Sequence, residues 1–210
     1  MGYDKVKLTE FEDREFADIE DILQTIADKL GIDFNSNLIK HKSRYMFFSE
    51  KTSSDTPTHL ELYRAFPDIK GVCHTHSNYA TSFAQAGEKI VAMGTTYADY
   101  FYGDIPCTRE LTKDETETDY ELNTSRVIIE AFKNIDYNLI PAVLVKHHGV
   151  FTWGNLAIQS VQNAIVLEEV AKMNFKTFLL NDRDNNLPQY ALNKHYYRKH
   201  GINTYYGQEE

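Results

Sequence analysis

The stretch Gly71–Gly103, GVCHTHSNYATSFAQAGEKIVAMGTTYADYFYG, decides the fold and carries the first sign of chemistry. Residues 70–73 favour a short strand that leads into His74-Thr75-His76. Because side chains alternate along a strand, we expect His74 and His76 to point to the same face. Two imidazoles on one face of a strand form a suitable pair of metal ligands. A His-x-His motif alone is weak, and two polar residues on a solvated face are the simpler interpretation.

The rest of this stretch predicts a helix, a strand and a loop. The helix covers residues 78–86, and Gly87 is a typical residue to end it. Residues 90–92 favour a short strand, and residues 94–103 form an aromatic loop bounded by glycines. Asp99 lies among these aromatic residues, a setting that suits general acid–base chemistry, although a simple turn aspartate is the alternative.

The segment Ser53–Pro57, SSDTP, predicts the start of another helix. Thr56 is a good N-cap, and Pro57 suits the first helical position. Two hydroxyl groups and a carboxylate therefore stand just before a helix N-terminus, where free backbone N–H groups favour an anion such as phosphate. A cap with no further role is the alternative, and the local sequence alone favours it.

Downstream, a histidine pair stands at the end of a strand. An amphipathic helix is predicted over residues 120–133, and a buried strand over residues 141–145. This strand runs into His147-His148, and α/β folds place their sites at strand ends.

Two further helices follow in the C-terminal part. The first is expected to begin after an Asn155 cap and to end near Lys176; the second begins at Pro188 and ends at Gly201. The residues expected to face inward from the first are Ile158, Val161, Ile165 and Val170.

The alternation of strands and helices predicts an α/β fold with a central sheet and helices on both faces. The N-terminal part, residues 1–50, adds a helical pattern at 16–30 and a possible strand at 44–49, without any sign of chemistry. With 210 residues, of which 42% are hydrophobic, the chain suits a single domain over residues 1–210.

Composition and charge exclude several classes of function. The net charge is −9, with 22 Lys and Arg against 31 Asp and Glu, which argues against a nucleic-acid partner. No apolar run is long enough to span a bilayer, and the first residues lack signal-peptide character. Cys73 and Cys107 are far apart and form no CxxC pair, so we expect a reduced, cytoplasmic protein.

Metal-ligand chemistry favours His74, His76 and one later histidine, with Asp55 as a candidate carboxylate ligand. Three protein ligands and one open position are typical of a catalytic Zn²⁺. Because no cysteine thiolate belongs to the set, Zn²⁺ or another divalent transition ion such as Mn²⁺ or Co²⁺ fits better in a catalytic role than in a structural one.

Longer motifs then connect these signals. They are SSDTPTH, HTHS with ATSFAQAG, GTTYADYFYGDIPCTR, HHG with FTWG, NAIVLEEVA, and HYYRKHG with YYGQ. Together they resemble the L-ribulose-5-phosphate 4-epimerases of the class II aldolase/adducin family, over about residues 53–208. The resemblance implies a three-layer α/β/α fold with a central mixed or antiparallel sheet flanked by helices.

The resemblance also assigns roles to residues. It implies a metal site of Asp55, His74, His76 and His148, phosphate binding by Ser53 and Ser54, an acid–base pair of Asp99 and Tyr206, and further site positions at Thr95 and Glu121. In the family these groups meet at a subunit boundary of a cyclic homotetramer, where the neighbouring subunit supplies the acid–base pair.

The implied substrate is a sugar phosphate, and the implied reaction belongs to arabinose catabolism. The inverted carbon has no acidic proton, so epimerisation needs a retro-aldol cleavage and re-addition to the other face of the aldehyde. The divalent ion stabilises the charge that develops on the sugar oxygens. Asp55 stands where the aldolases of the family place a glutamate base, which favours an epimerase.

Two alternatives stay open from the sequence. One is a sugar-phosphate aldolase that releases both fragments. The other is a weakly active, metal-binding, oligomeric homologue, because residues 1–50 lack the family's Gly-Asn-x-Ser and Lys-Pro-Ser-Gly motifs. Tyr97 also replaces a histidine that is usual in the family.

Overall fold

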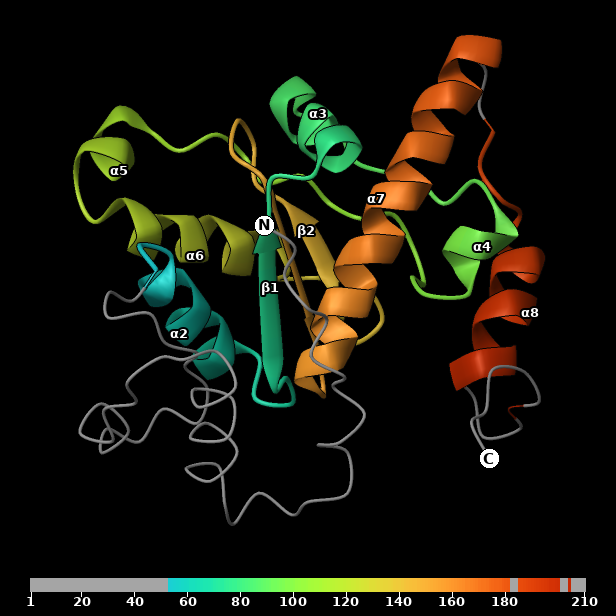
Figure 1. The fold of residues 1–210 in the computed structure, drawn as a ribbon, viewed down its shortest axis with the longest axis horizontal. Helices are drawn as coiled ribbons and strands as arrows, with labels where there is room; N and C mark the ends of the chain where they lie inside the picture. Colours follow the sequence, from blue (N-terminus) through green and yellow to red (C-terminus); the bar gives the residue numbers. More distant parts are fainter. Residues whose placement is uncertain (1–52, 182–184, 201–203, 205–210) are drawn as a thin grey trace, which may run out of the picture. The chain divides into compact units, whose positions relative to one another are not determined.

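A computed structural model describes residues 53–181, 185–200 and 204, which belong to one compact unit (Figure 1). The elements in chain order are α2 (Thr56–Ala65), β1 (Gly71–Thr75), α3 (Asn78–Ala86), α4 (Thr95–Ala98), α5 (Lys113–Glu117), α6 (Tyr120–Ala131), β2 (Ala142–Leu144), β3 (Val150–Gly154), α7 (Ala157–Leu180) and α8 (Gln189–His200). The predictions for residues 16–30 and 44–49, and for Gly201 and Tyr206, lie outside the described residues. Among the helices described, none is long and apolar enough to cross a bilayer.

The sheet described has three strands in the order β1-β3-β2, and both pairs are antiparallel. In the pairing of β1 with β3, His74 lies opposite Phe151 and Thr75 lies opposite Val150. This register brings the end of β1 beside the start of β3, although more than seventy residues separate them in sequence.

Helices cover both faces of this sheet, as expected for a three-layer α/β/α fold (Figure 1). On one face, the Thr152 hydroxyl donates a hydrogen bond to the Ser160 carbonyl of α7 at 2.8 Å. On the other face, the Trp153 ring packs against Phe66, which follows α2, and against Phe132, which follows α6, at 5.2 and 5.1 Å between ring centroids. The α/β prediction is therefore confirmed, with an antiparallel sheet.

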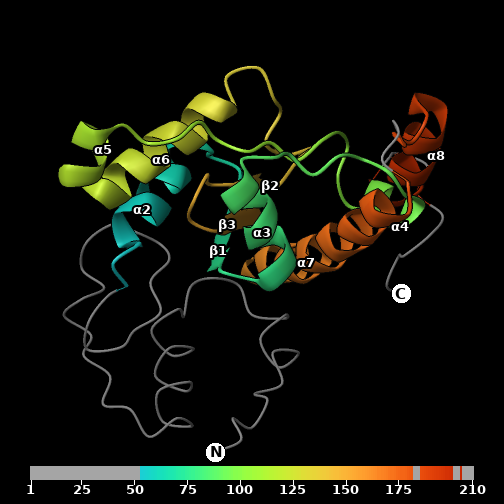
Figure 2. The same cartoon turned by 90° about the horizontal axis from the view of Figure 1, so that it is seen from above.

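Helix α3 follows β1 directly and packs against α7 (Figures 1 and 2). Its Tyr79 and Phe83 rings lie 5.7 and 6.3 Å from the Phe175 and Phe178 rings of α7. Gly87 ends α3 with φ +72°, a left-handed conformation that favours glycine. The predicted bounds of this helix are confirmed.

Three predictions of local structure are wrong. Residues 90–92 form no strand, because Ile90 makes only a single bridge to Ile105. The predicted loop contains the short helix α4, and the buried Tyr97 hydroxyl ties this helix to the flanking chain, 2.7 Å from the Gly103 carbonyl and 3.0 Å from the Ile90 carbonyl. Helix α2 begins at Thr56 with Asp55 as its N-cap residue, one position earlier than predicted.

For α7, the predicted first residue is wrong, and so are some of the residues predicted to be buried. The helix begins at Ala157 after Leu156 rather than after Asn155. Val161 and Ile165 are 43% and 62% exposed. Polar residues take core positions instead, because the Asn163 and Asn174 amides donate to the carbonyls of Trp153 and Val91. An apolar pattern cannot reveal such positions.

Candidate metal centre

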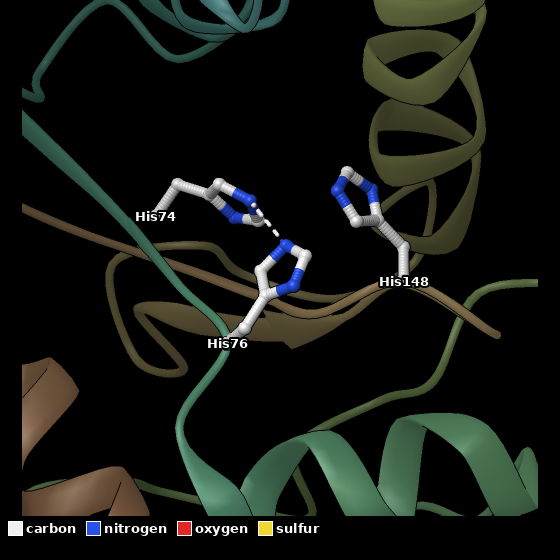
Figure 3. A group of neighbouring side chains, drawn as sticks. All are labelled: His74, His76 and His148. Atoms are coloured by element: carbon white, nitrogen blue, oxygen red, sulfur yellow. Dashed lines mark hydrogen bonds between the residues drawn. The ribbon is translucent and has the colours of Figure 1, made fainter.

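Three histidines from two distant segments meet beside the sheet (Figure 3). His74 belongs to β1, His76 follows it, and His148 lies in the turn between β2 and β3. One ring nitrogen of each lies within 4.8 Å of the others. The antiparallel pairing of β1 with β3 is what brings the two segments together.

His74 is held in one orientation. Its Nδ1 donates to the Val150 carbonyl at 2.9 Å, which leaves Nε2 as the nitrogen with a free lone pair. That Nε2 lies 3.0 Å from His76 Nε2. The His74 ring also stacks on Phe151, with 4.2 Å between ring centroids. A hydrogen bond to the second ring nitrogen is the usual way in which proteins orient a metal-binding histidine.

The turn that carries His148 has two unusual residues. His147 adopts φ +63°, a conformation that is uncommon outside glycine. Its exposed ring points away from the cluster toward Glu110, so the structure brings His148 rather than His147 to His74 and His76. At Gly149, a Cβ atom would lie 2.8 Å from His76 Cδ2 and from the Thr75 carbonyl, and 3.1 Å from His74 Cε1. The glycine therefore allows the turn to approach both rings.

The electrostatics favour neutral imidazoles at His74 and His148. Burial lowers the pKa of His74 below its ordinary value of 6.5, against the opposing effects of the Val150 hydrogen bond and Asp55. Burial also lowers the pKa of His148, and the neighbouring His74 and His76 lower it further. Neutral imidazole is the form that binds a metal.

These residues fit a divalent transition ion. Three neutral imidazole nitrogens are the donor set that Zn²⁺ and similar ions prefer. In addition, His148 Nδ1 is buried and has no hydrogen-bond partner in the described part of the chain. Buried nitrogen atoms without a partner are costly, so a ligand that uses these atoms would stabilise the arrangement.

Asp55 lies close enough to influence the cluster. Its carboxylate raises the pKa of His74 and of His148, although these are not the largest effects on either ring. It does not belong to the group of ligand atoms found within 4.8 Å of one another among the described residues. Ser53 Oγ donates to its Oδ2 at 3.4 Å, and both Ser53 and Ser54 are exposed at the start of α2.

The first turn of α6 borders the same cluster. Glu121 raises the pKa of His148, and its backbone carbonyl accepts a hydrogen bond from Thr58 Oγ1 at 2.6 Å. The Tyr120 ring lies 5.8 Å from the His148 ring. Tyr120 was not predicted as a neighbour of the cluster, although its position next to Glu121 in the sequence indicated it.

His59 was also missed. It packs edge-on against Phe151 at 5.8 Å, and burial lowers its pKa. The signal was its spacing: His59 follows Asp55 by four residues, and its N–H donates to the Asp55 carbonyl in the first turn of α2.

Asp99 lies in a different part of the molecule, at the end of α4 beside α8 (Figure 1). Arg198 of α8 donates through Nε to Oδ1 at 3.0 Å and through Nη2 to Oδ2 at 2.7 Å. His195 Nδ1 lies 3.4 Å from Oδ1, and His200 Nε2 donates to the Asp99 carbonyl at 2.9 Å. The hydrogen-bond partners of this carboxylate in the described structure thus include an arginine and a histidine of α8.

The two remaining predicted site residues are Thr95 and Tyr206. Thr95 is exposed at the first position of α4, next to Gly94. Tyr206 lies outside the described residues.

The fold is similar to that of solved aldolases. The chain is 21% identical to an L-fuculose 1-phosphate aldolase, with a TM-score of 0.56, over 71% of this chain and 65% of that one. It is 19% identical to an L-fuculose 1-phosphate aldolase from Glaciozyma antarctica PI12, with a TM-score of 0.51, over 75% of this chain and 53% of that one. It is 14% identical to an aldolase II superfamily protein from Pseudomonas syringae, with a TM-score of 0.52, over 71% of this chain and 56% of that one. The chain therefore spans between about half and two thirds of the length of these proteins.

A family match covers most of the sequence. Residues 26–175 match the family described as the Class II Aldolase and Adducin N-terminal domain. This range includes β1 to β3 and all three histidines of the cluster. The chain belongs to the class II aldolase and adducin family.

Proposed function

We propose that this protein is a divalent-metal-dependent epimerase that interconverts L-ribulose 5-phosphate and D-xylulose 5-phosphate. The observation that carries the proposal is the meeting of His74, His76 and His148 in a chain of this family. The choice of reaction rests on the long motifs that resemble the epimerases, and on Asp55 where the family's aldolases have glutamate.

The three histidines would hold the ion, with Asp55 as a further ligand. Zn²⁺ is the first candidate, and Mn²⁺ and Co²⁺ suit the same donor set. When bound, the ion supplies a Lewis acid for the negative charge that develops during cleavage of the bond between carbons 3 and 4. His74 is oriented for this role by Val150, whose carbonyl accepts its Nδ1 proton.

Ser53 and Ser54 would bind the substrate phosphate. Both are exposed and stand before the N-terminus of α2, where hydroxyl groups and the helix dipole favour an anion. Phosphate binding would keep the aldehyde fragment in the site while it rotates, so that the bond re-forms on its other face. Thr95 and Glu121 would complete the substrate pocket.

Asp99 and Tyr206 would move the proton of the hydroxyl group on carbon 4. One removes it as the bond breaks, and the other returns a proton after re-addition to the opposite face, which explains why two groups are needed. Because Asp99 lies beside α8 and not in the histidine cluster of its own chain, the proposal requires a neighbouring subunit to supply it, as in a homotetramer. The Arg198 contact would then fix its orientation.

A coupled assay tests the proposal. L-ribulose 5-phosphate and Zn²⁺ are added to the purified protein. The D-xylulose 5-phosphate formed is measured with a second enzyme that uses it as substrate. We expect turnover that His74→Ala abolishes and that His147→Asn, which alters the neighbouring exposed histidine, preserves. Formation of product at the rate of the His74→Ala protein would overturn the proposal.

A sugar-phosphate aldolase is the second candidate, favoured by the similarity of the fold to L-fuculose 1-phosphate aldolases. It predicts release of free aldehyde and ketone fragments, from L-fuculose 1-phosphate or from L-ribulose 5-phosphate. Fragments that accumulate as fast as the epimer would favour it.

A weakly active, metal-binding oligomer is the third candidate, because residues 1–50 lack two motifs of the family pattern. It predicts normal metal content together with weak binding of inorganic phosphate, and normal turnover would exclude it.

A further inference from the structure

We propose that Glu168 of α7 is a positioning residue for the histidine cluster and acts through α3. The proposal rests on the metal-binding role proposed above. Glu168 lies in the motif NAIVLEEVA, to which the sequence analysis assigned no chemistry.

The Glu168 carboxylate caps a helix that is not its own. It accepts hydrogen bonds from the Tyr79 N–H at 2.9 and 3.1 Å and from the Ala80 N–H at 2.9 Å. These two N–H groups belong to the first turn of α3, where a helix has no internal acceptor for them. A carboxylate at this end is also stabilised by the helix dipole.

The residue that normally supplies such a cap does not do so here. Ser77 is the N-cap of α3 and has the extended backbone of a capping residue, yet its side chain makes no cap hydrogen bond. Its buried Oγ has no hydrogen-bond partner among the residues that the structure describes. Within the described structure, the cap of α3 therefore comes from the side chain on α7.

Helix α3 connects both segments that carry the histidines. At its N-terminal end, His76 is separated from Asn78 by Ser77 alone. At its C-terminal end, the Ala84 carbonyl accepts a hydrogen bond from the N–H of His147, at 3.1 Å. A shift of α3 would therefore move His76 and the turn of His148 relative to His74, which β1 and Val150 hold.

The neighbouring glutamate provides a matched control. Glu169 is exposed, and its carboxylate lies 3.8 Å from Lys172 of the same helix. Glu169→Gln removes one negative charge from α7, as Glu168→Gln does, but leaves the contact with α3 in place. The pair of variants thus separates the cap from the change in net charge.

The experiment measures Zn²⁺ affinity by competition with a chromophoric chelator for the wild type, Glu168→Gln, Glu168→Ala and Glu169→Gln. We expect about 10- to 100-fold weaker binding for Glu168→Ala, a smaller loss for the isosteric Glu168→Gln, and less than about twofold change for Glu169→Gln. With Co²⁺ in place of Zn²⁺, the visible spectrum should change in the two Glu168 variants only.

Amide hydrogen exchange of the metal-free proteins gives a readout that global destabilisation would not mimic. We expect the Glu168 variants to lose protection at residues 78–86 while β2 and β3 keep theirs. Loss of protection throughout the sheet would overturn the positioning role, and so would variants that bind Zn²⁺ like the wild type. A wild-type protein that takes up no Zn²⁺ would instead overturn the metal function itself.

Discussion

The histidine cluster and the surroundings of Asp99 differ in how far their polar groups are satisfied. At the cluster, three ring nitrogens face one another, and His148 Nδ1 is buried without a partner among the described residues. At Asp99, both carboxylate oxygens accept hydrogen bonds from Arg198, and the backbone carbonyl accepts one from His200. Among the described residues, the first arrangement therefore leaves a buried nitrogen unpaired, whereas both oxygens of the second are paired.

Within one chain, the histidine cluster is the region left open for a ligand, while Asp99 is held in one orientation. The buried His148 Nδ1 gains no hydrogen bond from the described residues, so a ligand at the cluster would supply an interaction that the chain itself does not. A carboxylate paired with a guanidinium in two parallel hydrogen bonds is a strong structural contact in itself.

The largest effect is expected from His74→Ala. Loss of one ligand should remove the bound metal and lower turnover at least about a thousandfold, since the ion contributes several kcal/mol to transition-state stabilisation. Metal content after gel filtration, together with the coupled assay, measures this. The His147→Asn protein serves as control, and a His74→Ala protein with full metal content would contradict the proposed ligand set.

The next effect is expected from Gly149→Ala. The added Cβ would contact the His76 ring and the Thr75 carbonyl at 2.8 Å, so the turn must move away. We expect metal affinity to fall about tenfold or more and the free energy of unfolding to fall by about 1–3 kcal/mol. Gly94→Ala is the matched control, because a Cβ there has no atom within 4 Å. Equal metal affinity in the two variants would show that close packing of the turn against the His74 and His76 rings is not needed for metal binding.

Arg198→Met should separate the two regions. It leaves the nearly buried Asp99 carboxylate without its guanidinium partner, so the free energy of unfolding should fall by about 2 kcal/mol in urea titrations. Metal affinity should stay unchanged. Arg64→Met, which removes an exposed pair with Glu61, should cost less than about 0.5 kcal/mol. A parallel loss of metal binding in Arg198→Met would show that the two regions are coupled.

The smallest effect is a dependence of stability on pH in the metal-free protein. The pKa values of His74, His148 and His59 are lowered by burial from 6.5, so the unfolded chain binds more protons below that pH. The free energy of unfolding should therefore decrease as the pH falls from about 6.5 through the lower folded-state values. Urea titrations at several pH values, with a chelator present, measure this decrease. His74→Ala should show a shallower decrease, and an equal slope would contradict the assignment.

Elements with local signals were predictable from the sequence. Residues 70–73 favoured a strand, and the glycine after residue 86 marked the end of α3, which the structure confirms. Helix α7 was only partly predictable, because Asn163 and Asn174 enter the core through hydrogen bonds to carbonyls of other segments. Burial of an amide depends on its partner, and no periodicity in the sequence identifies that partner.

The contacts of the site also include some that the sequence predicts and some that it does not. Periodicity predicted that His74 and His76 share a face, but it cannot identify the neighbouring strand, so the approach of His148 required either a resemblance or the structure. The contact of Glu168 with α3 was not predictable, because its acceptors and donors lie nearly ninety residues apart. The Arg198 contact with Asp99 spans a similar separation.

The register of β1 with β3 has a consequence for how such proteins diversify. His74 opposite Phe151 is a ladder contact, so the approach of the two histidine segments depends first on two short strands that are far apart in sequence. The segment from α4 to α6 takes no part in this pairing, although it carries Thr95, Asp99 and Glu121. Variation in these elements can therefore change the proposed substrate and acid–base residues while the strand pairing that gathers the histidines is kept.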